Sequence, residues 1–165
     1  MKLITILSVL ALAASVRAET TLTMTGVHNC CKSCVNGITK AAADIKDVTV
    51  TAEGETVTIV SKKKGDAKKA AEAIIAGGYY GKFEGQDEVK NSPNADAKVS
   101  KATVSGVHLC CKKCVTAAEG AVKSVSGVSK YEIVSKAESF TVEGDFSKAE
   151  LVAALNAAGF AGDIK

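Results

Sequence analysis

Apolar and polar residues alternate with two different periods along the first half of the chain. A period of two, as from Thr20 to Val27, is typical of a half-buried strand, and helical spacing, as from Ser33 to Asp44, is typical of an amphipathic helix. The pattern predicts the order strand, helix, hairpin, helix, strand. The predicted elements span, in turn, residues 20–27, 33–44, 48–50, 57–59, 66–75 and 79–84.

The second half of the chain repeats this order. Asp66 and Ser147 are the predicted N-caps of the second helix in each half, and glycines at 77–78 and 159 are predicted to end those helices. The order βαββαβ in each half predicts an α+β protein of two tandem ferredoxin-like domains, each a four-stranded antiparallel sheet with two helices on one face. The predicted elements of the second half span residues 99–107, 112–125, 128–134 and 139–142, a helix between 147 and 159, and 160–165.

Two segments fall outside these patterns. Residues 1–18 carry one early lysine, an apolar run and a Val-Arg-Ala ending, which predicts a cleaved signal peptide and a secreted, periplasmic protein. The apolar run is shorter than the roughly 20 residues of a membrane span, so we expect no span after cleavage. Residues 85–97 are polar and contain the single proline, which predicts a linker between domains at 19–84 and 98–165.

Charge and motifs exclude several classes of function. Without residues 1–18 the chain has 19 basic and 18 acidic residues, a balance that gives no support for a nucleic-acid or membrane-surface partner. A Ser-His-Asp set, paired carboxylates in a pocket and a Gly-rich phosphate loop are all missing from the sequence. We therefore expect a protein that is not an enzyme.

All six cysteines lie in one decapeptide that occurs twice, as GVHNCCKSCV at 26–35 and GVHLCCKKCV at 106–115. Two residues separate the last two cysteines of each copy at a predicted helix start, so both sulfurs can converge on one ion. The positive end of the helix and the adjacent lysines favour the thiolate form. Thiolates select soft ions such as Cu(I), Hg(II), Cd(II) or Zn(II).

With these motifs the chain resembles the heavy-metal-associated domain, which occurs in copper chaperones, copper-exporting ATPases and the periplasmic mercuric-ion binding protein. The resemblance covers both halves. It implies that Cys31 and Cys34, then Cys111 and Cys114, are the metal-binding thiolates, with about one ion per domain. It also implies that the protein sequesters metal or passes it by thiolate exchange to a metal-transport or metal-receiving protein.

The sequence departs from that family in two respects. The family usually has a methionine two residues before the first cysteine of the pair, where this chain has Asn29 and Leu109. Each copy also adds a further cysteine and a histidine, so three or four ligands per site become available. We expect Gly26 and Gly106 to let the backbone turn so that the added cysteine reaches the ion. The added candidate ligands are Cys30, Cys110, His28 and His108.

Other uses of the cysteines remain open from the sequence. The motif could form a structural or regulatory disulfide, or belong to a thiol-disulfide redox protein, or staple an interaction module. A bridge between the adjacent Cys30 and Cys31 would be strained, and three cysteines cannot all pair within one domain. Whether the two sites act separately or pool their six thiols is likewise open.

Overall fold

The computed structural model describes residues 19–84 and 98–165, called domain 1 and domain 2 below. The predicted signal peptide and linker, residues 1–18 and 85–97, lie outside the described residues. Within the part that is described, no helix is both long and apolar enough to cross a membrane.

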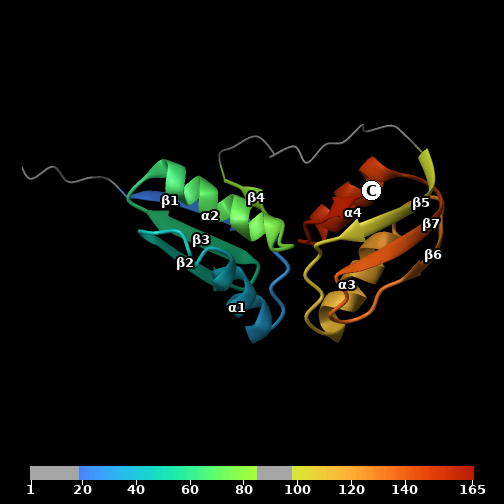
Figure 1. Ribbon diagram of the computed structural model, residues 1–165, viewed down its shortest axis with the longest axis horizontal. Helices are drawn as coiled ribbons and strands as arrows, with labels where there is room; N and C mark the ends of the chain where they lie inside the picture. Colours follow the sequence, from blue (N-terminus) through green and yellow to red (C-terminus); the bar gives the residue numbers. More distant parts are fainter. Residues whose placement is uncertain (1–18, 85–97) are drawn as a thin grey trace, which may run out of the picture.

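Each domain has the predicted βαββαβ order and an antiparallel four-stranded sheet. Most of these elements are labelled in Figure 1. The strand orders are β2-β3-β1-β4 in domain 1 and β6-β7-β5-β8 in domain 2, so the two sheets have equivalent topologies. The elements of domain 1 are β1 (Thr20–Thr25), α1 (Lys32–Ala41), β2 (Val48–Glu53), β3 (Thr56–Ser61), α2 (Lys64–Ala76) and β4 (Lys82–Phe83). Those of domain 2 are β5 (Lys98–Ser105), α3 (Lys112–Lys123), β6 (Val128–Glu132), β7 (Ser139–Ser147), α4 (Lys148–Ala157) and β8 (Asp163–Ile164). The two ferredoxin-like domains predicted from the sequence are confirmed.

The buried core follows from the predicted periodicity. Alternate residues of β3 are buried, beginning with Val57 and Ile59, and they share one apolar cluster with Ile38 of α1 and Ile74 of α2. The cluster continues into domain 2 and includes the cysteines Cys34 and Cys114 at the starts of α1 and α3 as well as Tyr79 and Phe160. The core therefore reaches the cysteine loops of both domains.

Several predicted boundaries differ from the structure. Helix α2 begins at Lys64, so Asp66 is not its N-cap but an acidic residue of its first turn, where a carboxylate still favours the helix dipole. The prediction for α4 is confirmed, since the Ser147 hydroxyl accepts a hydrogen bond from the Glu150 amide at 3.4 Å. Helices α1 and α3 end at Ala41 and Lys123, before the predicted 44 and 125.

The predicted last strands are shorter than expected because their first residues pair with the other domain. Tyr79 and Phe160 form an isolated antiparallel bridge between the domains. On either side of it, the Tyr80 amide donates to the Gly159 carbonyl at 3.0 Å and the Ala161 amide donates to the Gly78 carbonyl at 3.1 Å. These reciprocal contacts join equivalent positions of the two repeats around an approximate two-fold axis.

Candidate metal centre

The cysteine loops leave the sheets at a glycine with positive φ. Gly26 (φ 76°) follows β1 and Gly106 (φ 78°) follows β5, a conformation that glycine adopts without strain. Cys31 and Cys111 are then the N-caps of α1 and α3, and Cys34 and Cys114 lie buried in the first helical turns. The turn expected from the two glycines is present in both domains.

The turns bring the sulfurs of both domains into one cluster, which we call the six-sulfur cluster. All six thiols are free, and nine pairs of Sγ atoms lie 3.6–3.8 Å apart. Figure 1 shows the segments after β1 and β5 facing one another where the domains meet. Four contacts lie within a domain: Cys30–Cys34, Cys31–Cys34, Cys110–Cys114 and Cys111–Cys114. The other five join the domains: Cys30–Cys111, Cys30–Cys114, Cys31–Cys110, Cys34–Cys110 and Cys34–Cys114.

The neighbour relations in the six-sulfur cluster are those of an octahedron. Three further pairs lie within 4.8 Å, namely Cys30–Cys31, Cys31–Cys111 and Cys110–Cys111. With the nine contacts, every sulfur then has four neighbours and one opposite partner. Among the described residues, three pairs of sulfurs are not neighbours and lie opposite one another in the octahedron. These pairs are Cys30 with Cys110, Cys31 with Cys114 and Cys34 with Cys111.

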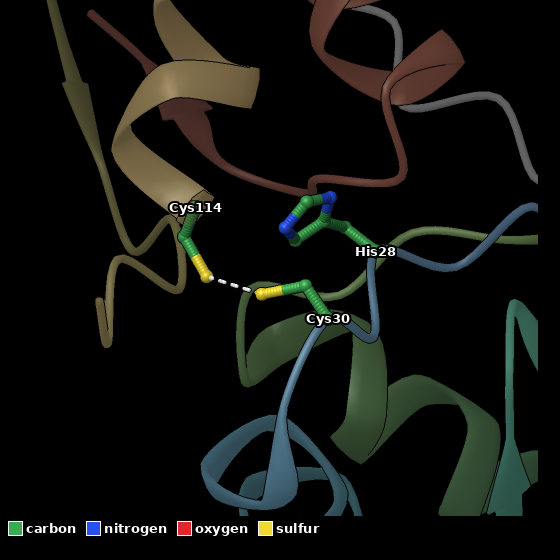
Figure 2. Close-up of side chains that lie close together, drawn as sticks. All are labelled: His28, Cys30 and Cys114. Atoms are coloured by element: carbon green, nitrogen blue, oxygen red, sulfur yellow. Dashed lines mark hydrogen bonds between the residues drawn. The ribbon is translucent and has the colours of Figure 1, made fainter. Parts of the chain in front are cut away.

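The two histidines lie beside the cluster in unequal positions. A ring nitrogen of His28 comes within 4.8 Å of the sulfurs of Cys30 and Cys114. Figure 2 shows these three side chains close together. Among the described residues, His108 belongs to no such three-donor group. Each histidine ring stacks on an aromatic residue of the other domain. His28 stacks on Phe160 and His108 on Tyr79, with ring centroids 4.5 Å apart in both pairs.

The surroundings of the six thiols shift their pKa values in different directions. The hydrogen bond from the Cys34 amide lowers the pKa of Cys31 to about 6, and the Cys114 amide lowers the pKa of Cys111 in the same way. Burial raises the pKa of Cys30 and Cys110 above the usual thiol range, and it does the same for Cys114. The Cys31 thiol can therefore ionise near neutral pH, and the pKa of Cys111 is shifted in the same direction.

This difference predicts the order of alkylation in the metal-free protein. At pH 7 we expect iodoacetamide to modify Cys31 and Cys111 roughly tenfold faster than Cys30 and Cys110, because the thiolate is the reactive form. Since the pKa of Cys31 is lowered, its labelling rate should fall as the pH drops through about 6. Peptide mass spectrometry of short labelling times measures the order. In guanidinium chloride all six thiols should react alike, and faster labelling of Cys30 in the folded protein would contradict the assignment.

The residues that join the domains were not recognised as part of the site from the sequence. Gly78 and Gly159 lie against the opposite cysteine loop: a Cβ on Gly159 would contact the amide nitrogen of His28, and one on Gly78 would lie 2.5 Å from the amide nitrogen of His108. The signal was present, since both glycines occupy the same position of the repeat. Tyr79 and Phe160 each contact the histidine of the other domain's cysteine loop.

A comparison with protein-family models finds one match in the second half of the chain. The heavy-metal-associated domain matches residues 101–161. No curated protein sequence matches the chain significantly.

Two solved structures are similar to the chain along most of its length. One is the solution structure of the N-terminal soluble domains of Bacillus subtilis CopA, with 17% identity over 90% of this chain and 95% of that chain. The other is the water-soluble region of the P-type ATPase CopA from Bacillus subtilis, with 16% identity over 90% and 93%. Both have a TM-score of 0.34, too low to add to the assignment. Domain 2 is therefore similar to the heavy-metal-associated domain, and domain 1 has the same topology and the same cysteine motif as domain 2.

Proposed function

We propose that this protein binds Cu(I) through thiolates that its two domains supply jointly, and that it sequesters the metal or delivers it to another protein. The observation that carries the proposal is the six-sulfur cluster, in which five of nine close sulfur contacts cross between the domains. Such a concentration of soft donors at a family-typical metal loop supports binding of a soft ion.

The geometry favours Cu(I) among the soft ions. Zinc in structural sites takes four ligands in a tetrahedron. An octahedron of sulfurs has no four vertices that are all mutual neighbours, whereas it has many groups of three. Cu(I) accepts three thiolates readily, so the six-sulfur cluster suits Cu(I) better than Zn(II). Hg(II) and Cd(II) are further soft ions that the same thiolates would bind.

Transfer of the metal ion to a partner protein would begin at the less buried sulfurs of the cluster. Cys34 and Cys114 are inaccessible to solvent, while Cys31 and Cys111 are partly exposed at the helix N-termini. An incoming thiolate from a metal-transport or metal-receiving protein can reach a metal ion from that side. The sequence of residues 1–18 supports action in a secreted or periplasmic compartment.

Native mass spectrometry of anaerobically purified protein tests this function. We expect Cu(I) to remain bound through the spectrum, with all six thiols reduced and a mature chain beginning at Glu19. The family resemblance predicts one ion per domain, so we expect at least two Cu(I) ions per chain. A variant with all six cysteines changed to serine is the control and should retain no Cu(I). If wild-type protein bound no more Cu(I) than this control, the proposed function would be wrong.

A further inference from the structure

We infer that the protein holds its copper as one tetranuclear Cu(I)–thiolate cage shared by the two domains, not as two separate ions. This inference rests on the proposed function and concerns how many ions the site takes and in what arrangement. Its basis is the octahedral arrangement of the six sulfurs.

The size of two of the sulfur triangles fits a three-coordinate metal ion. The triangle of Cys31, Cys34 and Cys110 has edges of 3.7, 3.7 and 3.6 Å, and that of Cys30, Cys34 and Cys114 has edges of 3.8, 3.8 and 3.6 Å. Dividing such an edge by the square root of three places the triangle's centre about 2.1 Å from each sulfur. Metal–thiolate bonds are about 2.3 Å long for zinc, so a slight expansion of each triangle accepts an ion.

The octahedron also limits the number of ions to four. With an edge of about 3.7 Å, the centres of two faces that share an edge are only about 1.7 Å apart, too close for two cations. Faces that share only a corner have centres about 2.5 Å apart, two thirds of the edge. An octahedron has four such alternate faces. If each of these four faces held one Cu(I) ion, every sulfur would bridge two copper ions.

The structure contains four sulfur triangles that share only corners with one another, which is one complete set of alternate faces. Three of its faces have all their sulfurs within 4.8 Å, and the fourth has all three edges at 3.8 Å or less. The four faces are Cys30–Cys31–Cys111, Cys31–Cys34–Cys110, Cys110–Cys111–Cys114 and Cys30–Cys34–Cys114. Three of the four faces combine sulfurs of both domains, so the cage requires both.

Charge and protons balance for this cage. Four Cu(I) ions replace six thiol protons, with no change of oxidation state, which leaves a cluster charge of −2. The N-termini of α1 and α3 point their partial positive charges at the sulfurs. Lys32, Lys112 and Lys113 lie in the first turns of the same helices. A dianionic cluster is therefore placed where the local field is positive.

The added cysteines make the inference testable. Every face of the octahedron contains either Cys30 or Cys110, because these two sulfurs are opposite one another. The double variant Cys30→Ser with Cys110→Ser therefore removes a sulfur from every face but leaves both Cys-x-x-Cys pairs intact. A cage predicts a fall from four Cu(I) per chain to at most two, whereas separate Cys-x-x-Cys sites predict two in both proteins.

The experiment is an anaerobic Cu(I) titration of the whole chain and of this variant, followed by native mass spectrometry and X-ray absorption. For the wild type we expect the four-copper species to form cooperatively, with three sulfurs per copper and a copper–copper distance of about 2.7 Å, which is two thirds of an edge expanded for bonds of about 2.3 Å. Two coppers in both proteins without metal–metal scattering would overturn the cage and leave the proposed function standing. No Cu(I) retained by the wild type would overturn both.

Discussion

Changing Cys34 to serine alone is expected to halve the copper capacity of the whole protein, from four Cu(I) per chain to two. The Cys34 sulfur is inaccessible to solvent and lies within 3.8 Å of four other sulfurs, two of them in domain 2. As a bridge it belongs to two of the four copper-binding faces, so its loss leaves two faces complete. We expect the cooperative four-copper species to be absent from native mass spectra of this variant.

The control for this variant must bury a hydroxyl without removing a sulfur. Ala70→Ser does so, because Ala70 is fully buried in α2 and is not part of the cysteine loops. Both variants should lose comparable stability in urea unfolding, but only Cys34→Ser should lose copper. If Cys34→Ser instead lost a single ion of two and left the spectrum of the domain 2 site unchanged, the two domains would bind metal independently.

Substituting alanine for Gly159 is expected to separate the two halves of the site. Gly159 has φ 82°, where a side chain costs about 1–2 kcal/mol. Its Cβ would also contact the His28 amide nitrogen and lie 2.5 Å from the Gly26 carbonyl oxygen, both backbone atoms of the domain 1 loop. The domains would have to move apart, which breaks the sulfur contacts between them. Copper capacity should fall to at most two ions per chain, and the radius of gyration from small-angle X-ray scattering should rise.

Gly54→Ala separates backbone strain from loss of the domain contact. Gly54 has φ 54° in the turn between β2 and β3, and a Cβ there would meet no atom within 4 Å. This variant should carry a similar backbone strain at its positive φ and yet keep four Cu(I) and the wild-type radius of gyration. If Gly159→Ala bound copper like Gly54→Ala, the cage would not depend on this contact.

Much of each domain could be predicted from the sequence because the signals are local. The alternation of Val57 and Ile59 with polar residues identifies a strand buried on one face, and Ser147 has a side chain that can accept the bond of an N-cap. Asp66 has such a side chain too, but α2 begins two residues before it, at Lys64. Helix boundaries depend on packing of the surrounding chain, which a local pattern does not contain.

The shared cluster could not be predicted because it depends on how the domains meet. The repeated motif identified all six cysteines and the turn at Gly26, but no periodicity specifies which surfaces of two domains dock. The contact rests on Gly78, Gly159 and the Tyr79–Phe160 bridge, whose sequence features are also those of an ordinary helix end followed by a strand. Only their proximity in space shows that each supports the cysteine loop of the other domain.

The reciprocal hydrogen bonds of Gly78 and Gly159 have a consequence for dilute solutions. Such paired contacts between equivalent residues are what a two-fold homodimer has at its interface, and a homodimer dissociates when its concentration falls. Here both partners are parts of one chain, so their association is intramolecular and has a fixed effective concentration. The proposed copper affinity should therefore be independent of protein concentration, even where only a few copies of the protein are present.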